Sequence, residues 1–424
     1  MSGWSSVKFQ ELYLTESRNG LNRPKRTRGS GFKMVNMGEL FAHERISDIE
    51  MDRVPMSDSE IERYSLRPGD LLFARQSLVL EGAGKCSIVL ETPEITTFES
   101  HLIRVRLNQD VADPQFFFNY FKSHHGKASI ASIVMQVAAA GIRGSELATL
   151  SVPSPPLHIQ KHVACILSAY DDLIDNNTHR MKILEKMAQM ICREWFVNFR
   201  FPGHEKFQMV KSEIGPIPKG WRAGLLRDMC ESIDYGYTAS AVEKPIGPKL
   251  LRITDIVPET IDWPSVPHCP SPERNPQKYR LLEGDIVVAR TGATTGYAKR
   301  LNKRHPESIF ASYLVRLRIK PEHSNSMVGL LVESDDYKRF IKANLGGAAQ
   351  PQANAQVLAS KPVAIPPSEL QAKFSAIAEP LLDQKEILQI KNVNLRQTRD
   401  LLLPKLISGE VSVEQFEAKA AQGV

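Results

Sequence analysis

The chain lacks the features that mark several common classes of protein. It has five cysteines in 424 residues, an odd number, and no two of them have the spacing of a metal site. We therefore expect reduced thiols and a cytoplasmic protein. The N-terminus lacks the charged and then apolar segment of a signal peptide. The most apolar run, 130–142, is shorter than the ~20 residues of a membrane-spanning helix, so no membrane contact is expected.

Catalytic motifs are also missing. There is no Gly-x-Ser-x-Gly elbow and no Asn-Pro-Pro-aromatic motif of a methyltransferase. The segment 82–85 lacks two of the positions that define a phosphate-binding loop. His158 and His162 have a spacing that can hold zinc on a helix, but no carboxylate accompanies them, so we interpret them as part of a solvated helix face. The sequence predicts a protein without catalytic residues, metal ligands or a cofactor of its own.

Charge and composition set only loose bounds. Lys and Arg number 54 against 48 Asp and Glu, the formal net charge is +6, and 42% of the residues are hydrophobic. A mildly basic balance tolerates a polyanionic partner without demanding one. A chain of 424 residues exceeds one ordinary core, so we expect two or more domains.

What the sequence does contain is an internal repeat. YSLRPGDLLFAR at 64–75 returns as YRLLEGDIVVAR at 279–290, an offset of 215 residues. FESHLIRVRL at 98–107 returns as FASYLVRLRI at 310–319, an offset of 212, and VPSPP at 152 returns as VAIPP at 363, an offset of 211. Because the order is kept and the drift is small, we infer a duplication with short insertions. Two copies of one module usually meet a target that also has two parts.

A long helix is predicted after each copy. The stretch 157–198 contains neither proline nor glycine, and its apolar positions alternate steps of four and three with Asn177 as the one strongly polar member. This pattern is typical of a coiled-coil seam in which a lone Asn fixes the register. At 1.5 Å per residue the helix would be roughly 60 Å long. The second helix has leucines seven apart, faced by polar side chains: Lys385, Asn392 and Arg399.

The expected fold class is α+β. It has two globular α/β modules related by pseudo-two-fold symmetry and separated by two long helices packed as an antiparallel coiled coil. The alternative is that each helix folds back on its own module. The expected boundaries are 1–153 for the first module, 154–203 for the central helix, 204–364 for the second module, 365–415 for the distal helix and 416–424 for a flexible tail.

Arginines at matched places are the first candidates for nucleic-acid contact. Arg75 and Arg290 end the same predicted strand in the two copies. The planar fork of arginine suits a bidentate grip on guanine or phosphate, and the alternative is an ion pair with the Asp five residues earlier, Asp70 or Asp285. Both interpretations stay open. Further candidates stand on the next predicted strand and in the turn after Arg290: Arg104, Arg316, Thr291 and Thr294.

The loop before each long helix is the second candidate. In the second copy it contains Gln350, Gln352 and Asn354, and in the first copy it contains Arg143. Gln and Asn can read adenine through a paired donor and acceptor. A flexible polar linker is the alternative.

Taken together, these features resemble the specificity subunits of type I restriction–modification systems. The resemblance rests on the duplicated module, on the Gly-Asp-(apolar)3-Ala-Arg motif and on the Pro-rich start of each helix, which is followed by Gln160 or Gln371. It is strongest in the segments 184–203 and 395–410.

The resemblance implies a function. Each module would be a target recognition domain that reads one half of a bipartite, asymmetric site in double-stranded DNA. The helices would set the spacing and dock two methyltransferase (modification) subunits, which bring S-adenosylmethionine for DNA methylation. Restriction/translocase subunits with ATP and Mg would add cleavage. A coiled-coil scaffold without base-specific reading is the alternative. The first copy departs from the family at Gln76, where Thr or Ser is usual, and at Arg143, where the loop is usually rich in Gln and Asn.

Overall fold

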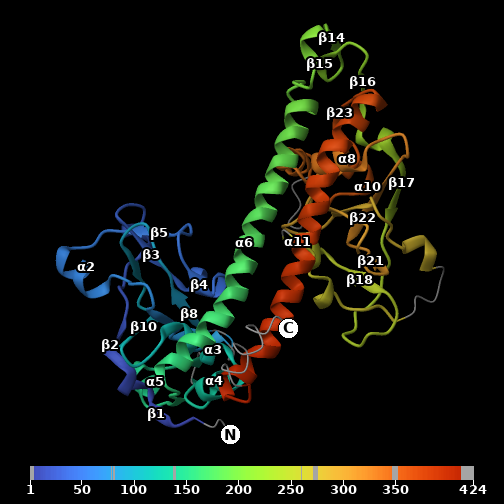
Figure 1. Ribbon diagram of the computed structural model, residues 1–424. Helices are drawn as coiled ribbons and strands as arrows, with labels where there is room; N and C mark the ends of the chain where they lie inside the picture. The colour runs from blue at the N-terminus through green and yellow to red at the C-terminus, as the bar shows by residue number, and fades with distance from the viewer. Residues whose placement is uncertain are drawn as a thin grey trace, which may run out of the picture. The chain divides into compact units, whose positions relative to one another are not determined.

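The computed structural model describes residues 4–77, 79, 82–136, 140–258, 260–270, 276–345 and 352–411. The chain divides into two compact units, Met1–Asp175 with Val393–Val424, and Asn176–Asn392. Each long helix passes from one unit into the other, so both units contain a part of both helices (Figure 1).

The two predicted helices are confirmed as α6 (Leu157–Phe196) and α11 (Ser368–Ser408), with 40 and 41 residues. The seam predicted for α6 faces inward, since Val163, Leu167 and Ala188 are buried. α11 stops at Gly409, whose φ of 74° suits glycine and whose Cβ, if present, would stand 2.6 Å from the Trp4 ring. No helix in the described ranges is long and apolar enough to cross a membrane.

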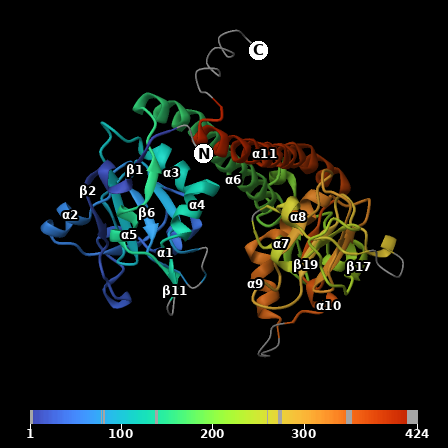
Figure 2. The ribbon, with the colours of Figure 1, turned by 90° about the horizontal axis from the view of Figure 1, so that it is seen from below.

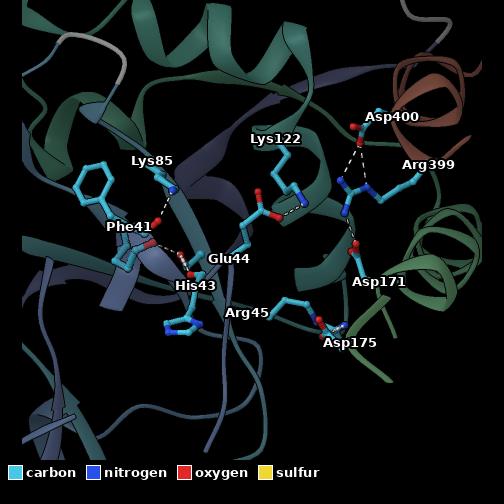
Figure 3. A network of polar contacts seen from close by, with 12 residues as sticks. Phe41, His43, Glu44, Arg45, Lys85, Lys122, Asp171, Asp175, Arg399 and Asp400 are labelled. Carbon is cyan, nitrogen blue, oxygen red and sulfur yellow. Dashed lines mark hydrogen bonds and ion pairs between the residues drawn. The ribbon is translucent and has the colours of Figure 1, made fainter. Parts of the chain in front are cut away.

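Within the second unit α6 and α11 run antiparallel. Asn177 donates from Nδ2 to Oδ1 of Asn392 at 2.9 Å, and both side chains are buried. Towards the C-terminal end of α6, the partners on α11 have lower residue numbers. Glu185 pairs with Lys385 at 2.9 Å, and the ring centroids of Phe196 and Phe374 lie 4.9 Å apart. The first unit holds the corresponding pair Asp171–Arg399 (Figure 3). The predicted antiparallel pairing is therefore confirmed, and the lone Asn of the α6 seam meets an Asn.

The first module, the globular part before α6, has eighteen α-helices and strands among its described residues. In chain order they are β1 (Ser6–Lys8), β2 (Tyr13–Asn19), β3 (Phe32–Val35), α1 (Met37–Ala42), β4 (Arg45–Ile46), β5 (Asp52–Val54), α2 (Asp58–Tyr64), β6 (Leu71–Ala74), β7 (Gln76–Ser77), β8 (Cys86–Val89), β9 (Thr96–Phe98), β10 (Leu102–Leu107), α3 (Pro114–Lys122), α4 (His124–Ala131), β11 (Met135–Gln136), β12 (Ala140–Gly141), α5 (Gly144–Ala148) and β13 (Ser151–Pro153).

The second module, between α6 and α11, follows the same plan. Among its described residues the α-helices and strands are β14 (Met209–Ser212), β15 (Gly215–Pro218), β16 (Arg222–Leu225), β17 (Cys230–Tyr235), β18 (Lys249–Leu251), α7 (Ile253–Ile256), β19 (Ile286–Ala289), β20 (Ala298–Arg300), β21 (Ser308–Phe310), β22 (Leu314–Ile319), α8 (Asn325–Glu333), α9 (Asp335–Ala343), α10 (Ala355–Leu358) and β23 (Pro362–Ile365).

The sheets repeat from one module to the other. The order β2-β10-β6-β8 in the first matches β17-β22-β19-β20 in the second, and the first continues to β4. The parallel pair β3–β9 corresponds to β18–β21, and the antiparallel pair β1–β13 corresponds to β16–β23. α3 packs on β8 and α4, as α8 packs on β20 and α9. Figure 2 labels these four helices. The sequence repeat is therefore a repeat of topology.

The Gly-Asp motif builds the frame of each module. Gly69 and Gly284 have φ of 87° and 82°, which favours glycine at this turn. The aspartate that follows is buried and takes two short hydrogen bonds from an arginine of the neighbouring strand, Asp70 from Arg106 at 2.7 Å and Asp285 from Arg318 at 2.8 Å.

Twin glutamines fasten each helix to its module. Gln160 accepts from the backbone N of Asp113 and donates to the carbonyl of Pro155, both at 2.8 Å. Gln371 accepts from the N of Ser324 and donates to the carbonyl of Pro366, both at 2.9 Å. Both amides are buried, and buried polar groups of this kind are normally hydrogen-bonded, as they are here.

Ion pairs tie each module to its helix a second time. Arg45 of β4 contacts Asp172 and Asp175 of α6 (Figure 3 shows Arg45 and Asp175). In the second module the ion pairs are made with Asp383 and Glu386 of α11, which stand 211 residues after Asp172 and Asp175 of α6. The basic partners there are Lys303 and Arg304. The helix acids are thus repeated, whereas their basic partners come from different segments.

Candidate nucleic-acid interface

In the second module the structure brings the two candidate segments together. The end of β19 and the loop before α10 are joined by a hydrogen bond from the N of Ala353 to the carbonyl of Arg290 at 2.8 Å. Thr291 and Gln352 form an antiparallel β-bridge beside it. The arginine-ended strand and the amide-bearing loop are therefore parts of one surface.

Arg290 stands where these two segments meet. Its guanidinium lies over the Tyr235 ring, 4.9 Å from the centroid, and Nη1 donates to the carbonyl of Ser312 at 3.5 Å. The Tyr235 hydroxyl accepts from the N of Ala355 at 2.9 Å, which fixes the ring under the cation. The alternative that Arg290 pairs with Asp285 is wrong, because that carboxylate is taken by Arg318.

The other predicted residues of this module stand in the two segments that meet at Arg290. Thr291 and Thr294 are half-buried, and Gln352 and Asn354 are exposed. Asn354 caps α10 by accepting from the N of Val357 at 2.9 Å, which leaves its amide N–H groups and one lone pair for a partner. Gln350 lies outside the described residues.

The first module has the same backbone hydrogen bond between its arginine and its loop. We call this link, Arg75 with Ile142 and Arg290 with Ala353, the clasp. The N of Ile142 donates to the carbonyl of Arg75 at 2.9 Å, and β12 pairs with β7 so that Gly141 faces Gln76. Arg75 is half-buried and Arg143 is exposed. Neither guanidinium forms a hydrogen bond or ion pair with the residues that the structure describes, so the alternative pairing of Arg75 with Asp70 is also wrong.

Arg104 and Arg316 lie in the interior, 4% and 3% exposed. Arg316 donates to Asp234 at 2.6 Å and to the carbonyl of Arg280 at 2.9 Å. This corrects the expectation that Arg316 is available to DNA, because its guanidinium is buried and neutralised by a carboxylate. Among the described residues Arg104 has only two hydrogen bonds, both long and to backbone carbonyls, and burial lowers its pKa to about 10. The two copies differ at this position.

Sequence reasoning missed several residues of the two surfaces. Tyr313 is 60% exposed, and its carbonyl accepts from the N of Arg290 at 3.1 Å. His101 is its exposed counterpart, with the same bond from Arg75 at 2.8 Å. Both stand in the repeated Phe-x-Ser-x-Leu motif at a position that differs between the copies. A position that varies inside a repeated motif was therefore a usable signal. Tyr235 carries no such signal.

No group of three or more His, Cys, Asp and Glu side chains that could hold a metal ion occurs in the part of the chain that the structure describes. All five cysteines are free, and Cys86, Cys192, Cys230 and Cys269 are buried. Burial raises the pKa of the Cys192 and Cys230 thiols to about 12, so both are protonated at neutral pH.

The fold is a repeated α+β module on a pair of antiparallel helices, and in each copy an arginine stands where the strand meets the loop. The family described as Type I restriction modification DNA specificity domain matches residues 57–186 and again 270–397, which is more than half of the chain. The chain belongs to this family, and the resemblance seen in the sequence motifs is confirmed.

Two curated relatives come from Methanocaldococcus jannaschii. The putative type I restriction enzyme MjaX specificity subunit is 29% identical over 226 residues, which cover 51% of this chain and 50% of the relative. The type I restriction enzyme MjaIX specificity subunit is 26% identical over 295 residues, which cover 65% and 64%. The chain thus spans between about half and two thirds of the length of these relatives.

A solved structure shares the fold. The S subunit of a type I restriction-modification system from M. genitalium aligns over 96% of each chain, with a TM-score of 0.58 and 14% sequence identity. At this identity the likeness shows the fold alone, and it supports the arrangement of repeated modules and long helices.

Proposed function

We propose that this chain is the DNA-recognition subunit of a type I restriction–modification complex and performs no catalysis itself. Each module reads one half of a bipartite, asymmetric DNA site. The observation that carries the proposal is the clasp found in both modules, in which the carbonyl of Arg75 or Arg290 binds the loop before the next helical segment. One frame thereby presents two different sets of side chains.

The side chains at the clasp suit direct base reading. The fork of Arg290 or Arg75 matches the O6 and N7 acceptors of guanine, and the amides of Gln352 and Asn354 match N6 and N7 of adenine. Each such bidentate pair contributes about 1–3 kcal/mol of discrimination against a wrong base. Since Arg143 stands in the first module where amides stand in the second, the two halves of the site would differ in sequence.

The helices would set the spacing and dock the partner subunits. A helix of 40 residues extends about 60 Å, which exceeds the ~34 Å of one turn of duplex DNA. Met190 on α6 and Leu401 on α11 stand 211 residues apart and are 57% and 70% exposed. Large apolar side chains exposed at repeated positions favour two copies of one partner, and we assign them to two methyltransferase subunits.

The partners would bring the cofactors. S-adenosylmethionine would bind to the methyltransferase subunits, and ATP and Mg to the restriction/translocase subunits, while this chain contributes residues that bind DNA. The proposal places the complex in the cytoplasm, together with the DNA that it reads.

Mapping of methylated adenine across a genome tests the proposal. The chain is expressed with its methyltransferase partner, with the partner alone and the chain alone as controls. The expected result is methylation at one split, asymmetric sequence only when both are present. Methylation by this chain alone would contradict the non-catalytic role. A complex that binds random duplex DNA no better than it binds other polyanions would favour the scaffold alternative.

A further inference from the structure

One cross-strand pair carries like charges in the first module and opposite charges in the second. Arg18 of β2 lies directly opposite Arg104 of β10. At the same register in the second module, Asp234 of β17 lies opposite Arg316 of β22 and binds it at 2.6 Å. Directly opposed side chains share one face of a sheet, and like charges there are destabilising. The first module thus carries a local cost that the second avoids.

The first module supplies no carboxylate for this pair within the described residues. Arg104 is 4% exposed, and neither its Nε nor the buried Nη1 of Arg18 has a hydrogen-bond partner there. The nearby carboxylate of Asp70 is held through both oxygens by Arg106. Arg18 instead lies over the Tyr64 ring, 5.7 Å from its centroid. The two arginines therefore stand opposite each other across the strands, and neither is paired with a carboxylate among the described residues.

The cluster has an accessible side. Arg18 is half-buried, whereas Arg63 and Arg67 beside it are exposed. Asn19, the next residue of β2, occupies the register of Tyr235, the residue that stacks on Arg290 in the second module. The cluster therefore begins one strand residue away from the surface to which we assign base contacts.

We propose that Arg18 and Arg104 bind one phosphate group of the DNA backbone, in the first module only. The inference rests on the proposed function. A phosphate accepts paired hydrogen bonds from a guanidinium fork and neutralises the like-charged pair. In the second module Asp234 already fills this role, so that module takes no phosphate at the same place. The first module would then make one more phosphate contact with the duplex at this position than the second module makes.

The test converts the first module to the charge pattern of the second. Arg18→Asp is assembled with the methyltransferase partner, and binding to a duplex that contains the mapped site is measured between about 50 and 200 mM salt. Loss of one phosphate contact lowers the slope of log K against log salt by about one. Binding of matched and mismatched duplexes should weaken alike, and the recognised sequence should stay the same. Lys127→Asp on α4 makes the same charge change at an exposed position and should leave the slope nearly unchanged.

Two further measurements separate folding from binding. Arg18→Asp should unfold at no lower temperature than the wild type, because the introduced carboxylate would pair with Arg104 as Asp234 pairs with Arg316. Arg18→Gln removes the charge without adding a carboxylate and should lower the salt slope by a similar amount. Inorganic phosphate, compared with chloride at equal ionic strength, should raise the unfolding temperature of the wild-type chain and not that of Arg18→Asp.

The possible results distinguish failure of the phosphate site from failure of the proposed function. An unchanged salt slope with sequence-specific binding intact overturns the phosphate site and leaves the proposed function standing. Stabilisation by inorganic phosphate with an unchanged slope assigns the cluster to a free phosphate and overturns its DNA role. Failure of Arg18→Asp to assemble with the methyltransferase assigns the cluster to a carboxylate of the partner and overturns the phosphate site. If the wild-type complex binds no split site, the proposed function itself fails.

Discussion

Replacing Arg290 by alanine should remove one half of the sequence recognition and leave the fold intact. The folding cost is small, since Arg290 is half-buried and makes one long hydrogen bond to Ser312 and one contact with the Tyr235 ring. A cation–π contact at an exposed site contributes about 0.5–1 kcal/mol. For a unit of this size that corresponds to a fall of about 1–4 °C in the unfolding temperature.

The loss in recognition should be larger. A bidentate contact between arginine and a base contributes about 1–3 kcal/mol, which is a factor of about 5 to 150 in discrimination at the base that Arg290 reads. The clasp that holds Arg290 is made by backbone atoms, so the substitution leaves the pairing of Thr291 with Gln352 in place. Arg75→Ala should have the same effect on the other half-site.

The assay is the methylation profile of the reconstituted complex on a library of split sites. Arg290→Ala should relax one or two base positions in one half and none in the other. Arg227→Ala, at an exposed arginine of the same module, serves as the matched control and should leave the profile unchanged. If either Arg290→Ala or Arg75→Ala degrades both halves, the model of two independent readers is wrong.

Three further outcomes test the frame. Asp285→Asn and Asp70→Asn should each cost about 3 kcal/mol in urea unfolding, because each removes the charge that neutralises a partly buried arginine. Asn177→Leu leaves the Asn392 amide without its Asn177 partner and should cost about 1–3 kcal/mol, whereas Asn177→Leu with Asn392→Leu should recover most of that stability in the same measurement. Burial lowers the pKa of His323 in the folded chain, so the unfolded chain binds the proton at a higher pH. Thermal stability should therefore fall as the pH drops below about 6.5. His323→Asn should flatten this fall when the unfolding temperature is measured between about pH 8 and 5.

The frame was predictable because its signals are local and periodic. Apolar residues recur at every third or fourth position of α6 because those positions are buried, and Asn177 is the one strongly polar residue among them. The repeated Gly-Asp motif predicted equivalent turns, and Gly69 and Gly284 both have a positive φ. Helix length, pairing and the repeat of topology followed from these patterns.

The clasp was not predictable in the same way, because it depends on pairing between residues far apart in the chain. Arg75 meets Ile142 and Arg290 meets Ala353 through backbone atoms, which leave no pattern in the side chains. The ion pair between Arg316 and Asp234 could not be predicted for the same reason, since the two residues are 82 positions apart in the chain. Alternation along the strand gave Arg104 and Arg316 the same sequence pattern and concealed their different surroundings.

The two copies agree and differ for one physical reason. Shared positions inside the frame, such as Asp70 and Asp285, are buried, and a change there costs several kcal/mol. Most positions at which the surfaces differ are exposed, as His101 and Tyr313 are, and changes there cost little, so two readers can diverge on one frame. The register of Arg18 departs from this rule. There the first copy places Arg18 opposite the buried Arg104, a difference that is costly for folding and that binding of an anion would offset.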